Sequence, residues 1–259
     1  MPLTAAERST TAEHEAVLAA QTALIERLGP TGLPAANGKI GVVLIGYSNV
    51  EQLGVPLVVQ KWPALPNRAP GVVLVNGGKN TAPANTLEVI QDPANVYWTT
   101  TLPGKIGGAG VAALQVQCVL INECVLNPMP RADLAQLWIK VLGIVKARYP
   151  NCRAAFLTPI GYCAYCNTVP QEPDAHDQGF AIADVVAAQA AGECGMELDK
   201  VPAVKFGAYY WADGEANGWP CSHYNPDGRH FTVAGANYAA DHFIAWMQAE
   251  PLFSGFAFV

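Results

Sequence analysis

The sequence has few charged residues and no long hydrophobic run. Only 14% of its 259 residues are charged, 51% are hydrophobic, and the formal net charge is -6. Nucleic acids and anionic membranes attract basic surfaces, so this acidic chain argues against both as partners. Glycine, proline or a charged residue interrupts every apolar stretch before it reaches the ~20 residues of a membrane-spanning helix. We therefore expect a soluble protein that acts on small neutral or weakly polar molecules.

The sequence shows neither an internal repeat nor the pattern typical of a signal peptide. No period of roughly 20–50 residues recurs, which argues against solenoids and propellers. Residues 1–26 lack a basic stretch followed by an apolar block, so we expect no signal peptide in this chain. A trimmed signal peptide would leave no trace, and the compartment stays open between secreted, periplasmic and cytoplasmic. Oligomeric state is equally open.

The seven cysteines are an odd number and cannot all pair within one chain. Cys163 and Cys166 have the spacing of a redox motif or half a zinc site, but no second pair accompanies them. We interpret them as buried thiols or one local disulfide, and we predict no metal site.

Five short, predominantly apolar runs predict strands buried on both faces of a parallel sheet. They are residues 40–45, 72–75, 116–121, 154–157 and 204–210. Helical patterns at 131–149, 179–191 and 233–248 lie between or after these runs. The sequence therefore predicts a single α/β domain over residues 1–259, with a doubly wound, five-stranded parallel sheet.

An amphipathic pattern precedes the first strand. Over residues 11–28 it places an apolar face on one side of an opening helix, which Gly29 and Pro30 would end. Residues 1–38 are thus predicted to form an N-terminal helix and a connecting loop. The residues expected to share the apolar face are Val17, Leu24, Ile25 and Leu28.

Residues with chemical potential follow several of the predicted strands. Ser48 comes after the first strand, Gly77 and Gly78 after the second, and Asn122 after the third. Asp227 and His230 lie in the loop that precedes the last helix. In a doubly wound sheet ligands bind beyond the carboxyl ends of the strands. We therefore expect these segments to converge at one edge.

These residue types suit a serine hydrolase. A serine hydroxyl becomes a good nucleophile when a base takes its proton, and His230 would take the proton of Ser48. Asp227, three residues before His230, would fix the imidazole tautomer and stabilise the imidazolium. Backbone N–H groups of Ser48 and of Gly78 or Gly77, with the side-chain amide of Asn122, would donate to the oxyanion. Taken alone, a serine after a strand is most often just a helix N-cap, and an Asx turn is the plainer interpretation of Asp-x-x-His.

The four blocks resemble those of the SGNH hydrolases, also called GDSL-type esterases. That family carries Ser, Gly, Asn and His in this order, with the acid three residues before the histidine. The resemblance covers residue 39 to about residue 247. It implies a flavodoxin-like three-layer sandwich and a carboxylic ester hydrolase that needs no cofactor and forms an acyl-enzyme on Ser48. Short acyl esters are implied as substrates, in particular acetyl esters, including those of carbohydrates.

The chain departs from the family pattern in two blocks. Residues 46–49 read Gly-Tyr-Ser-Asn where the family has Gly-Asp-Ser-Leu, which resembles a Gly-x-Ser-Asn variant in a bacterial subgroup. The third block reads Leu-Ile-Asn-Glu in place of Gly-x-Asn-Asp, so Asn80 and Asn127 are rivals of Asn122. The glycine block likewise leaves Gly77 and Gly78 to choose between.

Two other interpretations remain open. The two departing blocks are compatible with a carbohydrate-binding protein that keeps the fold without catalysis. A metal-dependent hydrolase could instead use the cluster at Cys221, His223, Asp227 and His230. The further candidate substrate-binding residues are Tyr47 and Asn49 beside Ser48, Tyr162 after the fourth strand, and Trp211 after the fifth.

Overall fold

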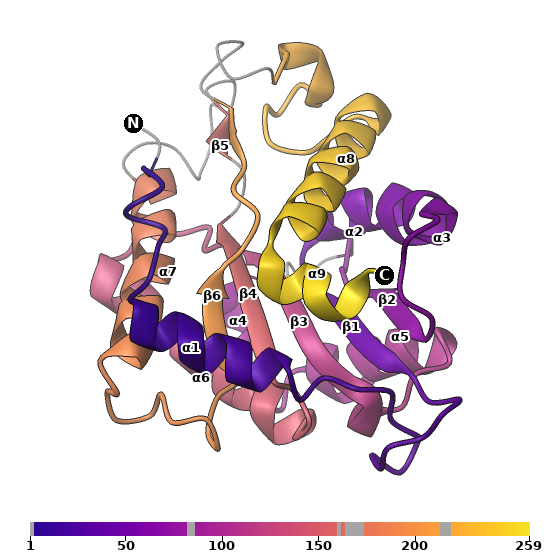
Figure 1. Cartoon of the computed structure of the whole chain (residues 1–259). Helices are drawn as coiled ribbons and strands as arrows, with labels where there is room; N and C mark the ends of the chain where they lie inside the picture. The colour runs from indigo at the N-terminus through magenta and orange to yellow at the C-terminus, as the bar shows by residue number, and fades with distance from the viewer. Residues whose placement is uncertain (1–2, 82–85, 160–161, 164–173, 213–218) are drawn as a thin grey trace.

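Five parallel strands form the central sheet (Figure 1). The structure is a computed structural model that describes residues 3–81, 86–159, 162–163, 174–212 and 219–259. The strands lie in the order β2-β1-β3-β4-β6, which is the flavodoxin-like order once they are renumbered along the chain. Their bounds are β1 (Ile40–Gly46), β2 (Val72–Asn76), β3 (Val116–Glu123), β4 (Ala154–Pro159) and β6 (Ala203–Phe206).

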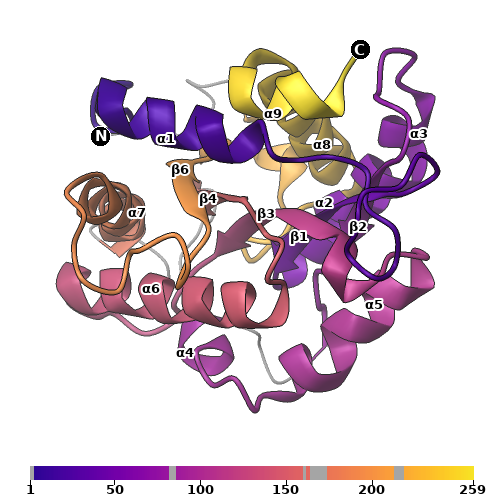
Figure 2. The same ribbon diagram turned by 60° about the horizontal axis from the view of Figure 1, so that its bottom comes forward.

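Helices cover both faces of this sheet, which makes a three-layer α/β sandwich. One face carries α1 (Ala12–Thr22), α2 (Ser48–Gly54), α8 (Val233–Ala249) and α9 (Pro251–Ala257). The other carries α4 (Leu87–Ile90), α5 (Leu102–Gly108), α6 (Arg131–Arg148) and α7 (Asp174–Ala190), and Figure 2 shows the two layers above and below the strands. Side chains of β3 alternate between the layers: Val119 and Ile121 enter one core, Cys118 and Leu120 the other. The predicted fold class is confirmed.

Short helical turns and a small second sheet lie between the main helices and strands. A π-helical turn, η1 (Val55–Lys61), and then α3 (Trp62–Ala64) continue directly from α2, and a second π-helical turn, η2 (Tyr97–Thr101), leads into α5. Short 3-10 turns are η3 (Ala113–Gln115) and η5 (Cys221–His223). A separate two-stranded sheet consists of β5 (Tyr162–Cys163) and β7 (Trp211–Ala212). No helix in the described part of the chain is both long enough and apolar enough to cross a membrane.

The fifth predicted strand is shorter than expected. It ends at Phe206 and not at residue 210, and Gly207 makes the last ladder bond by donating its N–H to the carbonyl of Leu157 at 2.7 Å. The next donor along β4 would be residue 159, which is a proline and has no N–H. The ladder therefore stops there.

The first helix is also shorter than predicted. It ends at Thr22, and Leu28 instead exchanges two backbone hydrogen bonds with Lys39, at 3.1 and 2.8 Å. The predicted apolar face was half wrong. Ile25 and Leu28 are buried, but Val17 and Leu24 are 38% and 51% exposed, and Leu18 occupies the core in their place.

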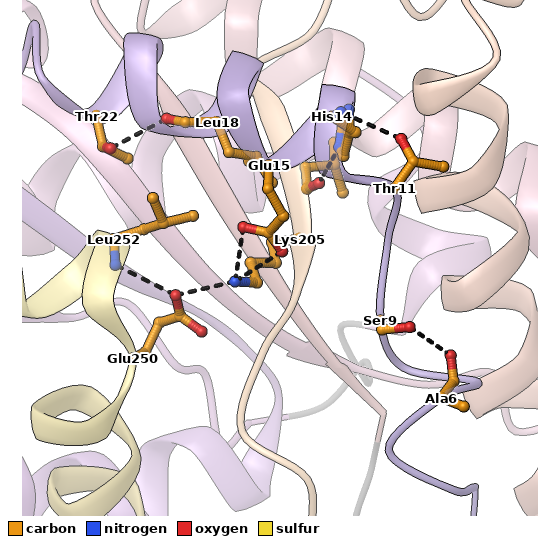
Figure 3. A network of polar contacts seen from close by, with 11 residues as sticks. Ala6, Ser9, Thr11, His14, Glu15, Leu18, Thr22, Lys205, Glu250 and Leu252 are labelled. Carbon is orange, nitrogen blue, oxygen red and sulfur yellow. Dashed lines mark hydrogen bonds and ion pairs between the residues drawn. The ribbon is translucent and has the colours of Figure 1, made fainter.

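An ionic cluster fixes α1 and α9 on the edge strand β6 (Figure 3). The ammonium of Lys205 lies 3.0 Å from a carboxylate oxygen of Glu15 and 3.0 Å from one of Glu250. His14 adds a contact of 3.0 Å between its Nε2 and the carbonyl of Val204. Both bonds of Lys205 are partly shielded, since only 17% of its side chain is exposed. The N-terminal helix is thereby tied to the edge strand of the sheet.

Candidate active site

Ser48 stands at a tight turn between β1 and α2. The strand ends at Gly46 and the helix begins at Ser48, so a single residue, Tyr47, connects them. A Cβ atom at Gly46 would lie 2.2 Å from Cγ2 of Val50 and 2.4 Å from the carbonyl oxygen of Asn122. Only glycine allows the chain to turn this closely. The turn holds Ser48, which is 5% exposed, at the carboxyl end of β1.

Three side chains form a continuous hydrogen-bonded chain at this point. The Oγ of Ser48 lies 2.7 Å from Nε2 of His230, and Nδ1 of His230 lies 2.5 Å from Oδ2 of Asp227. Ser48 and His230 are 182 positions apart in the sequence. The fold therefore brings together the hydroxyl, the imidazole and the carboxylate in the connectivity that nucleophilic serine catalysis uses.

The loop that carries His230 is held by its own hydrogen bonds. Oδ1 of Asp227 accepts the backbone N–H groups of Arg229 and His230, both at 2.9 Å. Gly228 has φ of +68°, a conformation that L side chains rarely adopt. Asp227 thus forms the Asx turn of the plainer interpretation and contacts the imidazole as well. The two roles use different oxygens of one carboxylate.

The helix that follows the nucleophile also fixes this loop. The side-chain carbonyl of Gln52 accepts the N–H of Phe231 at 3.0 Å, and the amide of Asn49 donates to the carbonyl of Arg229 at 3.3 Å. Both bonds run from α2 to the His230 loop. The position of the imidazole is therefore set from the same element that presents Ser48.

The carboxyl of Asp227 is ionised over a wide pH range. Partial burial alone would raise its pKa, but the hydrogen bond to His230 and the N–H groups of Arg229 and His230 outweigh that effect and lower the pKa to about 2. A carboxylate that stays charged can accept from Nδ1 of His230. The lone pair at Nε2 then faces Ser48.

Ser48 and His230 open onto a small cavity of about 30 Å³. Of the predicted residues, Tyr47, Asn49 and Asn122 also line it. Four lining residues were not predicted: Glu123, Cys124 and Leu126 follow Asn122 in the chain, and Arg229 precedes His230. A glutamate directly after the predicted strand and next to Asn122 is a signal that could have identified the first of them. The described lining residues are Tyr47, Ser48, Asn49, Asn122, Glu123, Cys124, Leu126, Arg229 and His230.

Asn122 is the asparagine that the fold brings to this cavity. Its side chain is 8% exposed, and its amide donates to the carbonyls of Thr158 at 3.3 Å and Pro159 at 2.7 Å. The rivals Asn80 and Asn127 are exposed and are not among the described residues of the cavity wall. The placement therefore favours Asn122 among the three.

Gly77 and Gly78 lie outside the described cavity wall. The N–H of Gly78 donates to Oδ1 of Asn76 at 3.0 Å, and the carbonyl of Gly77 accepts the hydroxyl of Tyr97 at 2.9 Å. A Cβ atom at Gly77 would lie 2.2 Å from the carbonyl oxygen of Leu44, and one at Gly78 would lie 2.4 Å from the backbone nitrogen of Glu51. Close packing of β2 against β1 and α2 accounts for both glycines.

Other predicted residues lie partly or wholly outside the described part of the chain. Tyr162 and Trp211 pair through their backbones as β5 and β7, but their side chains are not among those described, and neither is Cys166. Among described cysteines, Cys118, Cys124 and Cys152 are buried thiols, while Cys194 and Cys221 are exposed thiols. Within the described ranges, no three His, Cys, Asp or Glu side chains are grouped as a metal site.

Comparison with known proteins gives structural matches alone. No protein-family model matches the chain, and no curated protein matches its sequence. A structure from Streptococcus pneumonia, provisionally described as a platelet activating factor, has a TM-score of 0.52 at 13% identity, covering 90% of this chain and 92% of that chain. This likeness shows a shared fold.

Two further solved structures are similar at lower TM-scores. A protein from Slackia heliotrinireducens, provisionally described as an SGNH hydrolase, has a TM-score of 0.42 at 17% identity, covering 81% of this chain and 100% of that chain. A carbohydrate esterase family 2 enzyme with a carbohydrate-binding domain, from Corynascus thermopiles (Myceliophthora fergusii), has a TM-score of 0.46 at 13% identity. The match covers 83% of this chain and 67% of the enzyme's chain.

Proposed function

We propose that the protein is a serine ester hydrolase of the SGNH type. The observation that carries this proposal is the chain of contacts from Ser48 Oγ through the imidazole of His230 to the carboxylate of Asp227. A helix N-cap alone requires no imidazole at 2.7 Å, and an Asx turn alone requires no contact to a distant serine. The arrangement is therefore better explained by catalysis than by local structure.

In the proposed reaction the Oγ of Ser48 attacks the ester carbonyl while Nε2 of His230 takes the hydroxyl proton. The tetrahedral intermediate collapses to an acyl-enzyme, and the imidazolium returns the proton to the leaving alkoxide. Water then attacks the acyl-enzyme, with His230 again as the base. Asp227 accepts from Nδ1 throughout, which stabilises the imidazolium of both steps.

The oxyanion is proposed to bind between the backbone N–H of Ser48 and the amide of Asn122. The side-chain amide of Asn122 makes two hydrogen bonds, and the one to the carbonyl of Thr158 is the longer, at 3.3 Å. We assign the hydrogen of this longer bond to the oxyanion. Gly78 stays a predicted third donor, with Gly77 as its alternative. The N–H of Gly78 would have to leave Oδ1 of Asn76 before it could contribute.

Short acyl groups are the proposed substrates. A volume of about 30 Å³ is on the scale of one or two water molecules and suits an acetyl group better than a long chain. For the alcohol part, the sequence resemblance favours carbohydrates. Tyr47 and Asn49, at the cavity wall, are proposed to contact the ester, and Tyr162 and Trp211 are kept as candidates for the alcohol side.

Replacement of the nucleophile tests this function. In Ser48→Ala we expect kcat for p-nitrophenyl acetate to fall by roughly 10⁴-fold or more, because no hydroxyl remains to form the acyl-enzyme. The matched control is Ser222→Ala, an exposed serine in η5 close in sequence to the His230 loop, which should keep full activity. Steady-state kinetics on the folded variants measures both. Retention of activity in Ser48→Ala would reject the proposal.

A further inference from the structure

One ionisable side chain of the cavity has no part in this mechanism. Glu123 ends β3 directly after Asn122, is 2% exposed, and lines the same cavity as Ser48 and His230. Its Oε2 accepts the N–H of Cys124 at 3.2 Å, whereas its Oε1 has no hydrogen-bond partner among the described residues. A buried polar atom without a partner destabilises the folded protein. Because Glu123 lines the cavity, its unpaired oxygen indicates a partner that the described residues do not supply.

The protonation state of Glu123 decides what it can offer. Burial raises its pKa well above the usual range; the N–H of Cys124 opposes this effect, and the negative charge of Glu88 adds to it. Burial thus favours the neutral carboxyl, which has one O–H donor as well as an acceptor oxygen. Glu88 itself has another role. Its Oε1 accepts the N–H groups of Leu126 and Asn127, at 3.3 and 3.4 Å, and so holds the loop after β3.

The chemistry of the proposed reaction indicates which lining residues of the cavity contact the acyl group. The leaving alcohol must lie at His230, since Nε2 of that residue gives it a proton. The acyl group, bonded to Oγ of Ser48, then takes the remaining part of the cavity. Among the lining residues, Glu123 ends β3 and Cys124 and Leu126 come after it, and we assign this side of the cavity to the acyl group. The thiol of Cys124 is not a rival nucleophile, because burial raises its pKa and keeps it protonated.

We propose that Glu123 selects the acyl group: its carboxyl hydrogen-bonds a hydroxyl on the carbon next to the ester carbonyl, so the enzyme prefers short α-hydroxyacyl esters. This inference rests on the proposed function. Glycolyl and propionyl groups have nearly the same size, so a cavity that selected by volume alone would treat them alike. A site with a buried hydrogen-bonding group instead disfavours the analogue that leaves the group unpaired.

An acyl series with matched variants tests this assignment. We would measure kcat/KM for p-nitrophenyl acetate, propionate and glycolate, and divide each value by the rate of the same ester with hydroxide. The normalised glycolate-to-propionate ratio of the wild type should exceed about 10. It should fall by ~10-fold or more in Glu123→Leu, and it should stay within about 3-fold of wild type in Glu123→Gln, whose amide can still donate and accept. Glu193→Leu, an exposed acid on the loop after α7, is the control and should leave the ratio unchanged.

The outcomes distinguish a failure of this inference from a failure of the proposed function. Turnover of acetate and propionate with a normalised glycolate ratio near one would overturn the role of Glu123 and leave the hydrolase standing. A ratio that Glu123→Leu does not alter would overturn it as well. No turnover of any of the three esters would overturn the proposed function together with the inference. If Glu123→Leu does not fold, the wild-type ratio and Glu123→Gln still decide.

Discussion

At the scale of single residues, the site depends on Asp227 using its two oxygens differently. Oδ1 accepts two backbone N–H groups and shapes the loop, while Oδ2 accepts from the imidazole of His230. The aspartate and histidine could be paired from the sequence, because an Asp-x-x-His spacing within a turn is local. The lack of a partner for Oε1 of Glu123 among the described residues could not be predicted, because it depends on side chains that come from remote segments.

Asparagine at position 227 should separate these two tasks. Its carbonyl can keep the backbone bonds of Oδ1, but its amide would face Nδ1 of His230 and favour the tautomer that carries its proton on Nε2. That tautomer cannot accept the proton of Ser48. We expect kcat for p-nitrophenyl acetate in Asp227→Asn to fall by roughly 10⁴-fold while the fold is kept. A loss of less than about 10-fold would contradict the assigned role.

The same substitution should change the pH dependence of stability. The pKa of Asp227 is lowered from 3.8 to about 2, so its carboxylate stabilises the folded state above pH 3.8, and this contribution is lost as the pH falls towards about 2. The difference in unfolding free energy between wild type and Asp227→Asn should therefore shrink between those pH values. Urea denaturation across this range measures it. A difference that stays constant with pH would show that the charge of Asp227 does not contribute. Because 40% of the side chain is exposed, the effect should also weaken with salt.

At the scale of elements, the strands could be predicted and their ends could not. Predominantly apolar runs marked β1 to β4 because both faces of the sheet are covered. The end of β6 depends on the missing N–H of Pro159 in the neighbouring strand, and the end of α1 depends on the pairing of Leu28 with Lys39. Both causes lie in tertiary contacts. Helical periodicity likewise gives no sign of the π-helical turn η1, in which the period itself changes.

Packing of β2 against α2 should not tolerate a side chain at Gly78. Its Cβ would lie 2.4 Å from the backbone nitrogen of Glu51, so backbone must move. We expect Gly78→Ala to lose about 1–3 kcal/mol of unfolding free energy in urea denaturation, and to lose activity as α2 shifts Ser48. Gly143→Ala in α6 is the matched control, because nothing lies within 4 Å of a Cβ there. It should gain about 0.5–1 kcal/mol. Equal effects of the two substitutions would contradict the packing argument.

At the scale of the whole molecule, the topology is what makes the site. The carboxyl ends of β1 and β3 lie side by side, since Gly46 pairs with Asn122, and the loop before α8 returns to the same edge. This convergence could be predicted because parallel strands present all their carboxyl ends at one edge. Which N–H groups are already occupied there could not be predicted. The bond from Gly78 to Asn76 is an example, since it depends on a rotamer and not on a pattern.

The proposed activity requires Ser48 to act as the nucleophile and His230, which is distant in the sequence, to act as its base. Labelling with a fluorophosphonate, followed by mass spectrometry of the intact protein and its peptides, tests it most directly. We expect one adduct per chain, located on Ser48, with labelling at least ~100-fold slower in His230→Gln and absent in Ser48→Ala. A chain that takes up no label, or that carries the label on another residue while Ser48 stays unmodified, would contradict it.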